Sequence, residues 1–322
     1  MKVLFVTNQP NYCHKRFAEA VGAEFYRVKH FVPDGIPIVS LPINGWFNSR
    51  KLPEADVYFA ESIMDYYPVF YKNPKGKKVI LIAEDTLFKL EGMSKPKREF
   101  ILKLFRSADG FVAISDLCKE LLRKYVDKPC VVAYPFPHED FSDVNADMRQ
   151  KNILFIGRAD KTKGYLKLVE AVKILREKDL EWTLYLIGKC SDDVKEEIGI
   201  KPIGVVKDMA PYFERCSVLV HPADFDPCPA TVFEAMQAGI VPIISGNIGQ
   251  SKIFLENGMK SLVLDSTDPK VIAAKIEELQ HKGLKIFSYK AKQLVSTYNE
   301  VQRLSIFKRE FSDLMKEMGV VV

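Results

Sequence analysis

The sequence predicts an α/β protein made of two doubly wound, Rossmann-like domains that face each other across a cleft. Short apolar runs of strand length alternate with longer runs of helical periodicity, and this alternation occurs twice along the chain. Strands separated by helices favour parallel sheets. The chain has 322 residues, which at roughly 100–200 residues per domain is enough for two domains.

The first series of elements is expected over residues 1–148. Its predicted strands are Val3–Thr7, Asp56–Ala60, Lys78–Ala83, Gly110–Ser115 and Cys130–Ala133. Helical periodicity predicts helices at Lys15–Val21, Lys97–Arg106 and Leu117–Tyr125. The following stretch, Tyr134–Asn152, contains Pro135 and Pro137 and a long polar run. Because proline interrupts both ladders and helices, this stretch is interpreted as the connection between the domains.

The second series is expected over residues 149–300. Its predicted strands are Ile153–Gly157, Thr183–Gly188, Ser217–His221 and Val241–Ser245. Helices are predicted at Tyr165–Glu177, Thr231–Ala238 and Lys270–His281, and Ser288–Met318 is expected to be mostly helical. The last residues, 301–322, are predicted to form a C-terminal helix.

Composition and charge exclude several classes of protein. Apolar residues make up 47% and charged residues 28% of the chain, which excludes a disordered or collagen-like protein. The net charge of +5 suits an anionic small ligand and argues against a dedicated nucleic-acid binder. No apolar run reaches the roughly 18 residues that a membrane-spanning helix needs. The cysteines show no C-x-x-C spacing, so we expect neither zinc nor a disulfide framework, and a reduced, cytoplasmic compartment.

A first motif follows a predicted strand and precedes a predicted helix. It begins with Gly157, which permits a sharp turn, and it places Arg158 and Lys163 beside the start of the helix. Free amides and the positive end of the helix dipole already favour an anion there. The motif therefore predicts a diphosphate site, with two solvated basic residues as the alternative that spacing alone leaves open.

A second motif also runs from strand through loop to helix. Pro227 and Pro229 stiffen the loop, and Gly239 suits the end of the helix. The acids Asp226 and Glu234 are eight residues apart, a little over two helical turns, so both side chains can face one cleft. Carboxylates accept hydrogen bonds from sugar hydroxyl groups. The alternative is a capping aspartate followed by an exposed helical glutamate.

Together the two motifs resemble the retaining glycosyltransferase family four, one of the glycosyl transferases group 1 with the two-domain GT-B fold. Members typically show G-R-x-x-x-x-K-G, then E-x(7)-E running into E-A-M-A-x-G. This chain has Gly157-Arg158 with Lys163-Gly164, and Asp226 seven residues before Glu234-Ala235-Met236. The resemblance covers about residues 150–280.

The resemblance implies roles for individual residues. Arg158 and Lys163 would hold the diphosphate, Glu234 the ribose hydroxyl groups, and Asp226 the donor sugar in place of the usual glutamate. Arg158, Lys163 and Asp226 are the catalytic candidates. The remaining donor-site candidates are Gly157, Val206 and Met209 in a base-contacting loop at Val205–Met209, and Cys228, Pro229, Ala230 and Thr231, whose backbone would face the sugar.

Two departures from the family pattern bear on the acceptor side. The Gly-Gly loop usual after the first strand is replaced by Asn8-Gln9-Pro10-Asn11, and a histidine usual after a central strand is replaced by Glu84-Asp85. Asn11, His14, Glu84 and Asp85 are the candidates for contact with the acceptor. The alternatives are a helix-capping acid at 84–85 and a surface pair of His14 with Lys15.

No metal site and no cofactor besides the donor are expected. The D-x-D pattern of Asp224 and Asp226 is typical of metal binding in another transferase fold, but its neighbours fit the pattern above. The basic stretch Lys95–Arg106 is interpreted as a solvated amphipathic helix, with docking on anionic lipid at the inner membrane face as the alternative.

The predicted function is a metal-independent, retaining hexosyltransferase. It would move a sugar from a nucleoside-diphosphate sugar to a glycan, lipid-linked or other hydroxyl acceptor. The acceptor would bind in the first domain, the donor in the second, and the C-terminal helix would cross back to the first. The alternatives are a degenerate, non-catalytic partner that binds nucleotide or glycan, and a sugar-nucleotide epimerase. No G-x-G-x-x-G follows Val3–Thr7, so a dinucleotide oxidoreductase is disfavoured.

Overall fold

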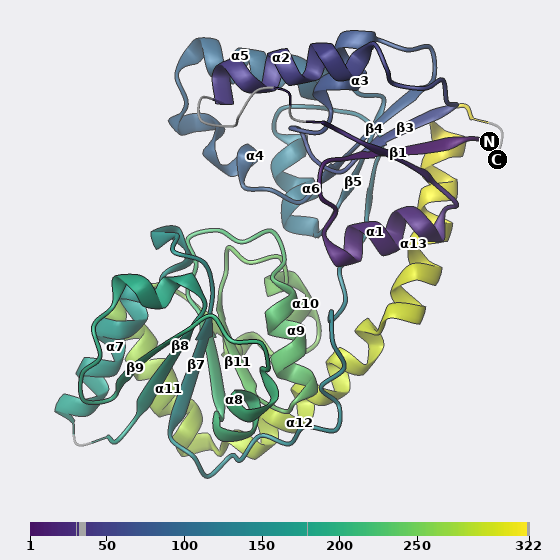
Figure 1. Ribbon diagram of the computed structural model, residues 1–322. Coiled ribbons are helices and arrows are strands. Elements are labelled where there is room, and N and C mark those ends of the chain that lie inside the picture. Colours follow the sequence, from purple (N-terminus) through teal and green to yellow (C-terminus); the bar gives the residue numbers. More distant parts are fainter. Residues whose placement is uncertain (30, 32–36, 179, 321–322) are drawn as a thin grey trace. The chain divides into compact units, whose positions relative to one another are not determined.

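The computed structural model describes residues 1–29, 31, 37–178 and 180–320. They form two compact units. Unit 1 comprises Met1–Pro135 together with Glu300–Val322, and unit 2 comprises Phe136–Asn299. Each unit carries a six-stranded parallel sheet with helices packed around it (Figure 1). The parallel sheets agree with the alternation of strands and helices seen in the sequence.

The sheet of unit 1 has the strand order β2-β1-β3-β4-β5-β6. Three of its central strands, β1, β3 and β5, are fully buried, because their continuous apolar runs are covered on both faces. The edge strand β2 was not predicted, since three of its four residues are exposed and give no apolar run. The strands are β1 (Val3–Thr7), β2 (Glu24–Arg27), β3 (Val57–Ala60), β4 (Lys77–Ile82), β5 (Gly110–Ala113) and β6 (Cys130–Val132).

Two helices of unit 1 begin at polar side-chain caps that the sequence supplies. Asn11 accepts a hydrogen bond from the amide of Cys13, and Ser115 accepts one from the amide of Cys118. These helices are α1 (Tyr12–Ala20), α2 (Pro37–Ser49), α3 (Tyr67–Lys72), α4 (Thr86–Lys89), the 3₁₀ turn η1 (Leu90–Gly92), α5 (Lys95–Ser107), α6 (Asp116–Arg123) and α13 (Glu300–Glu317). The basic helix α5 buries Ile101, Leu102, Leu104 and Phe105 inside unit 1.

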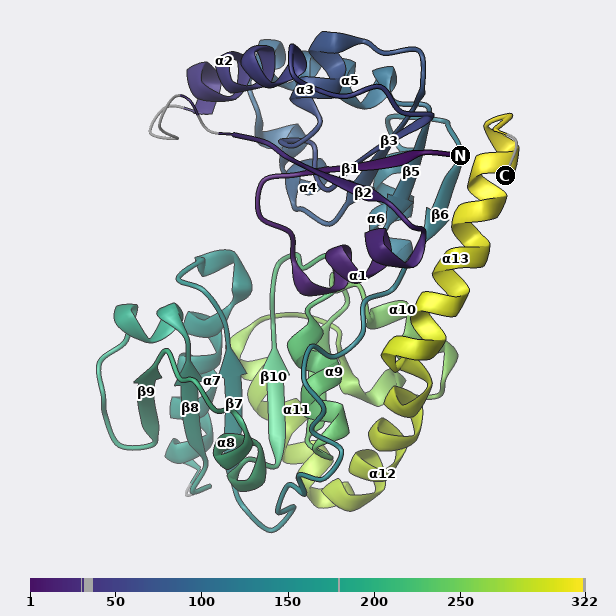
Figure 2. The same ribbon diagram turned by 45° about the vertical axis from the view of Figure 1, so that its right-hand side comes forward.

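The C-terminal helix α13 is part of the core of unit 1, where it lies beside α1 and β6 (Figure 2). The ring centroids of Phe17 and Phe307 are 4.7 Å apart, and those of Phe59 and Phe311 are 5.5 Å apart. At the start of the helix, Arg16 forms an ion pair with Glu300. The last helix of the chain therefore completes the unit that the first strand begins.

The sheet of unit 2 has the strand order β12-β11-β10-β7-β8-β9. The strands are β7 (Asn152–Ile156), β8 (Thr183–Ile187), β9 (Ile200–Gly204), β10 (Val218–His221), β11 (Val241–Ser245) and β12 (Val263–Leu264). The edge strands β9 and β12 were not predicted, because β9 contains the exposed Lys201 followed by Pro202 and β12 has only two residues.

The helices of unit 2 follow the predicted ones closely, with two changes. The short helices α8 and α10 were not expected, and the stretch Ser288–Met318 is interrupted at residues 296–299. The helices are α7 (Tyr165–Glu177), α8 (Ala210–Arg215), α9 (Ala230–Gln237), α10 (Ser251–Glu256), α11 (Pro269–Lys282) and α12 (Leu284–Val295), with the 3₁₀ turns η2 (Lys161–Lys163), η3 (Lys189–Asp193), η4 (Lys260–Leu262) and η5 (Ser296–Tyr298).

Residues 136–148, which the sequence prediction assigned to the first domain, belong to unit 2. The amide of His138 donates a hydrogen bond to Glu234. The rings of Phe141 and Phe213 pack edge to face with centroids 4.7 Å apart. These contacts hold the segment against unit 2, so unit 1 ends at Pro135 instead of residue 148.

Both sheets have a point at which the strand order reverses. In unit 1 it lies between β1 and β3, and in unit 2 it lies between β7 and β10. Loops diverge from the carboxyl ends of the strands at such a point, and ligands bind there in open α/β sheets. Within the described ranges, no helix is long and apolar enough to cross a membrane. All six cysteines are free thiols.

Candidate functional site

The turn between β7 and α7 is fixed by its own residues and by the next loop. The side chain of Asp160 accepts a hydrogen bond from the amide of Thr162 at 3.0 Å, which caps the 3₁₀ turn. Gly164 has φ of 81°, and a Cβ there would lie 2.1 Å from the carbonyl oxygen of Pro222. The last position of this motif therefore requires glycine for its backbone angle and for its close neighbour.

Backbone hydrogen bonds join the loops that follow β7, β10 and β11. The amide of Asp224 donates to the carbonyl of Thr162 at 2.7 Å, and the amide of Gly249 donates to the carbonyl of Asp226 at 3.0 Å. A Cβ on Gly249 would lie 1.9 Å from the carbonyl oxygen of Pro227. The loops therefore hold one another, and side chains on them have fixed positions.

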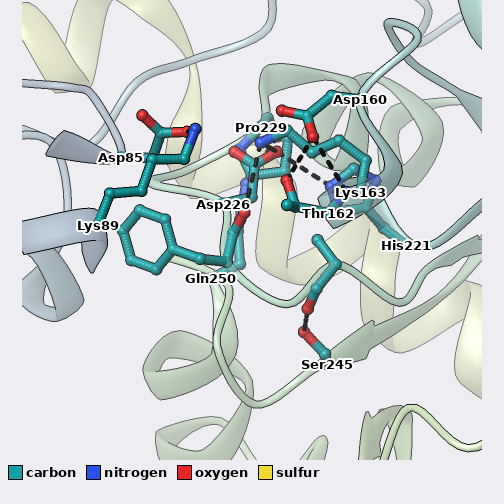
Figure 3. A network of polar contacts seen from close by, with 12 residues as sticks. Asp85, Lys89, Asp160, Thr162, Lys163, His221, Asp226, Pro229, Ser245 and Gln250 are labelled. Atoms are coloured by element: carbon teal, nitrogen blue, oxygen red, sulfur yellow. Dashed lines mark hydrogen bonds and ion pairs between the residues drawn. The ribbon is translucent and has the colours of Figure 1, made fainter. Parts of the chain in front are cut away.

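A polar cluster of the buried Lys163 and His221 and the half-buried Asp226 occupies the switch point of unit 2 (Figure 3). The ammonium of Lys163 lies 2.8 Å from Asp226 Oδ2, and His221 Nε2 lies 3.1 Å from the same oxygen. Lys163 also donates to the carbonyl of Phe225 at 3.3 Å. The ring of His221 stacks on Phe155, which fixes its plane.

The charges of this cluster compensate each other. Burial alone raises the pKa of Asp226, but the hydrogen bonds and positive charges of His221 and Lys163 outweigh it and hold that pKa below its ordinary value. Asp226 is therefore a carboxylate. The prediction that Lys163 and Asp226 belong to one site agrees with this geometry, but here they pair with each other, and Asp226 caps no helix.

Arg158 is the second predicted cation of the diphosphate site. It lies two residues after the end of β7, and it is exposed. Among the residues that the structure describes, its guanidinium has no hydrogen-bond or ion-pair partner. Arginine presents donors in a fork that matches phosphate oxygens, so this side chain is suited to an anion that arrives at the carboxyl end of β7.

Glu234 is buried on α9, which excludes the alternative of an exposed helical glutamate. Its exposed fraction is 8%, and Oε1 accepts the amide of His138 at 3.1 Å. Burial raises the pKa of Glu234 above its ordinary value, and the charge of Glu139 adds to the effect. A buried carboxyl with one bonded oxygen fits a role in accepting hydroxyl groups.

The other predicted donor-site residues lie on the same edge of the sheet. Pro229 precedes α9, which begins at Ala230 with no side-chain cap. Cys228 is buried, and Thr231 is half-buried. The remaining two, Val206 and Met209, are half-buried and follow the outer strand β9. Gly157 donates its amide to the carbonyl of Ile187 at 2.9 Å.

His221 and Gln250 are site residues that the sequence analysis missed. Gln250 is fully buried, and its Nε2 donates to the carbonyl of Pro229 at 2.7 Å (Figure 3). Its Oε1 has no partner in the described part of the chain. His221 is the last residue of β10, so its place at the carboxyl end of a central strand was the available signal.

The two aspartates of the D-x-D pattern bind lysines. Asp224 pairs with Lys167 at 2.5 Å, and Asp226 pairs with Lys163. Across the residues that the structure places, no group of three or more His, Cys, Asp or Glu side chains is arranged to hold a metal ion.

Unit 1 contains a cavity of about 550 Å³ at its own switch point. Asn11, His14 and Glu84, three of the predicted acceptor-side residues, line it. Asp85 does not line the cavity, and its carboxylate pairs with Lys89. It precedes α4 but makes no side-chain cap.

Two buried acids of this cavity, Glu61 and Asp65, were not predicted. Glu61 accepts hydrogen bonds from the amide of Asn11 at 2.8 Å and from Thr7 Oγ1, and it lies 2.9 Å from His14 Nδ1. His14 therefore pairs with a buried carboxylate, and the alternative of a surface pair with Lys15 is wrong. Glu61 follows β3 directly, so its position at a strand end was the signal.

Two Rossmann-like units, each with a polar site at its switch point, give the chain the fold of the GT-B glycosyltransferases. Residues 150–282 match the family described as glycosyl transferases group 1. These findings confirm the predicted fold class, and they confirm the resemblance at the level of the GT-B, group 1 glycosyltransferases.

Of two curated relatives, one is named a glycosyltransferase. An uncharacterised 41.2 kDa protein of the cps region of Klebsiella pneumoniae is 30% identical over 36% of this chain and 33% of its own length. The uncharacterised glycosyltransferase YqgM of Bacillus subtilis is 24% identical over 45% of this chain and 44% of its own. The alignments thus span less than half of each curated relative.

A solved structure shows the same fold over nearly the whole chain. The structure of Alr3699/HepE of Anabaena in complex with UDP and glucose superposes with a TM-score of 0.72 at 14% identity. The alignment covers 98% of this chain and 99% of that one. At this level of identity the likeness concerns the fold.

Proposed function

We propose that this protein transfers a sugar from a nucleoside-diphosphate sugar to a hydroxyl acceptor, with the donor bound in unit 2. The observation that carries the proposal is a pair of cations in the turn after β7, at the switch point of the unit that matches glycosyl transferases group 1. Lys163 is buried, and the exposed Arg158 has no hydrogen-bond or ion-pair partner among the described residues. Breaking a glycosyl–phosphate bond leaves a diphosphate, whose growing charge needs fixed positive groups.

The leaving diphosphate would receive two cations and backbone donors. Arg158 would bind its oxygens with two donors. Lys163 would exchange its contact with Asp226 for a phosphate oxygen, and Asp226 would keep His221 and turn toward the donor sugar. The uncapped first turn of α9 adds free amides. The protein groups supply the charge that a metal provides elsewhere, so we infer that the transfer needs no metal ion.

The nucleoside end of the donor would lie farther along the same edge. Glu234 would accept the ribose hydroxyl groups with the oxygen that does not bind His138. The loop with Val206 and Met209 would contact the base. The complex of HepE with UDP makes UDP the first nucleotide to test. We infer retention of configuration from the two-motif pattern, and we infer a glycan, lipid-linked or other hydroxyl acceptor.

A thermal-shift panel tests the proposal. UDP, GDP and ADP and their sugar conjugates are added to the full chain, first without metal and then with magnesium. A ligand at about 100 times its dissociation constant adds roughly 2.7 kcal/mol to the free energy of unfolding. We expect one diphosphate to stabilise the protein without metal and to lose that effect in Arg158→Ala. Equal stabilisation of Arg158→Ala would contradict the diphosphate role.

A second candidate function, nucleotide binding without turnover, is favoured by one observation. Asp226 is held by both Lys163 and His221 instead of pointing free into the site. If this arrangement persists with donor bound, the protein would bind nucleotide as a partner subunit. Release of nucleoside diphosphate from the stabilising donor, followed with and without a glycan mixture, separates the two: turnover supports the enzyme, and binding without release supports the partner.

A further inference from the structure

The cavity of unit 1 is built by the ends of three neighbouring strands. Residues 8–11 follow β1, Glu61, Ser62 and Asp65 follow β3, and Ala83 and Glu84 follow β4. The volume of about 550 Å³ falls in the range of small-molecule sites, roughly 300–1,000 Å³. The cavity is therefore large enough for a sugar ring and its substituents.

The charged groups of this cavity are almost all acidic. Asp65 is 9% exposed and accepts a hydrogen bond from Ser62 at 2.8 Å. Glu84 accepts the amide of Ile63 at 3.0 Å and the hydroxyl of Thr86 at 3.1 Å. These partners are neutral, and the described lining residues include neither lysine nor arginine. No lysine or arginine of the described lining is thus available to compensate these carboxyl groups.

The acids of the wall already repel one another. Burial raises the pKa of Asp65 to about 7, and the charges of Glu61 and Glu84 add to the effect. Burial also raises the pKa of Glu84. A phosphate or carboxylate brought into this cavity would add a further like charge in a poorly solvated place.

His14 gives the cavity an oriented acceptor besides its acids. Its Nδ1 lies 2.9 Å from Glu61, which also accepts two other donors and is therefore an acceptor toward the ring. In the neutral imidazole the hydrogen is then on Nδ1, as assigned from this hydrogen-bond network, and Nε2 accepts. Among the placed residues Nε2 has no partner, and the ring lines the cavity.

From these contacts we propose that the cavity binds a sugar ring that carries no phosphate or carboxylate group, as the acceptor of the transfer. The proposal rests on the proposed function for its second part. Hydroxyl groups of the ring donate to Asp65, Glu84 and His14 Nε2, while Met64, Tyr67 and Pro68 offer apolar surface to its C–H face. Phosphorylated or acidic sugars are excluded, because sites for such anions present arginine or lysine.

Histidine NMR of the full chain tests the proposal. The probes are methyl glycosides of glucose, galactose, mannose and N-acetylglucosamine, each paired with its 6-phosphate and its uronic acid counterpart. The ring signal of His14 is assigned with His14→Gln, and exposed His281 in unit 2 is the internal control. We expect at least one neutral glycoside to shift the His14 signal saturably, with its charged counterparts binding at least about tenfold more weakly.

Two matched variants locate the selectivity. Glu84→Gln should lower the affinity for the neutral glycoside about 5- to 10-fold. It should also reduce the ratio of this affinity to that for the 6-phosphate, because one negative charge is removed. Exposed Glu91→Gln in the same unit should change neither value. Asp65→Asn gives a second reading should Glu84→Gln fold poorly, and the unshifted signal of His281 checks for general effects.

The outcomes separate this proposal from the proposed function. Tighter binding of a 6-phosphate or uronic acid, or no shift of His14 by any neutral glycoside at about 100 mM, overturns the cavity assignment. Stabilisation by nucleoside diphosphate is measured on the same preparation. If a neutral glycoside shifts the His14 signal but no nucleoside diphosphate stabilises the protein, the cavity remains a sugar site and the donor assignment is wrong. If a nucleoside diphosphate stabilises the protein but no glycoside shifts the His14 signal, only the cavity assignment is wrong.

Discussion

The buried Asp65 and the half-buried Asp226 show how neighbouring groups decide the direction in which the pKa of a desolvated carboxyl group shifts. Asp226 has His221 and Lys163 on one oxygen, and its pKa lies below the ordinary value. Asp65 has a serine hydroxyl and two nearby acids, and its pKa rises to about 7. Desolvation acts on both in the same direction, so the sign of the shift is decided by the charge of the partners.

The free energy of unfolding should therefore fall as the pH rises from about 4 to about 7 through Asp65. The pKa of this group is 3.8 when unshifted and about 7 in the folded protein, so the folded state holds a proton that the unfolded chain has released. Asp65→Asn removes this term. We expect the free energy of unfolding of the variant, relative to that of wild type, to rise by roughly 2–4 kcal/mol from pH 4 to pH 8.

Urea unfolding at the two pH values measures this change. The exposed Asp127→Asn in the same unit is the control, for which the difference from wild type should be the same at both pH values. A pH-independent difference for Asp65→Asn would show that its carboxyl group is already ionised at low pH in the folded protein.

Glu234 makes a second prediction at the residue scale. Glu234→Gln keeps an oxygen for the amide of His138 but turns an amide nitrogen toward the ligand, so the acceptor for a ribose hydroxyl is lost. We expect donor binding to weaken by roughly 1–3 kcal/mol, the scale of a charge-assisted hydrogen bond. Calorimetric titration with the stabilising nucleotide and with its 2′-deoxy analogue measures this change. We expect the wild-type protein to bind the nucleotide more tightly than the analogue, and Glu234→Gln to bind both with equal affinity.

At the scale of elements, the loops after β7, β10 and β11 behave as one body because their backbones are in contact. Gly164 and Gly249 lie too close to the carbonyls of Pro222 and Pro227 for any side chain. The backbone contacts join Thr162 to Asp224 and Asp226 to Gly249, so a substitution in one loop should change the stability of the others.

Gly164→Ala tests this coupling against a matched control. Both Gly164 and Gly258 have positive φ, 81° and 68°, but only Gly164 has an atom within 4 Å of the new Cβ. Gly258→Ala should cost about 1 kcal/mol of stability from the backbone angle alone. Gly164→Ala should cost at least about 2 kcal/mol more and weaken nucleotide binding, since the loop must move away from Pro222. Equal losses measured by thermal unfolding would contradict the close packing.

The sequence predicted those elements whose buried residues form a regular apolar pattern. The strand at 3–7 and the helix at 165–177 were predicted with their observed bounds. Every residue of the strand is buried, and the helix buries one face. The edge strand β2 exposes three of its four residues, and β9 carries the exposed Lys201 followed by Pro202, so neither strand forms a buried apolar run. Site residues followed the same rule. Arg158 and Glu234 each belong to a contiguous sequence motif, whereas Asp65 and Gln250 become site residues only through loops that the fold brings together.

At the scale of the whole molecule, the two ends of the chain build one unit. Strand β1 and helix α1 precede the whole of unit 2 in sequence, and α13 follows it, yet their side chains form a single aromatic core. Unit 2 is a continuous segment inserted between them. The periodicity of Ser288–Met318 predicted a mostly helical stretch, but the residues that α13 packs against are separated from it by nearly the whole chain.

Phe307→Ala should therefore destabilise unit 1 and leave unit 2 unchanged. Phe307 is fully buried between Phe17, Phe59 and Phe311, and truncating a buried phenylalanine costs roughly 3–5 kcal/mol. Hydrogen exchange should show lost protection in β1 and β3, with β7 and β10 protected as in wild type. Val301→Ala on the same helix is the control, because this side chain is 79% exposed and its loss should change stability by less than about 0.5 kcal/mol. Loss of protection in β10 as well would mean that the two units unfold together, and the nucleotide site would then depend on the last helix of the chain.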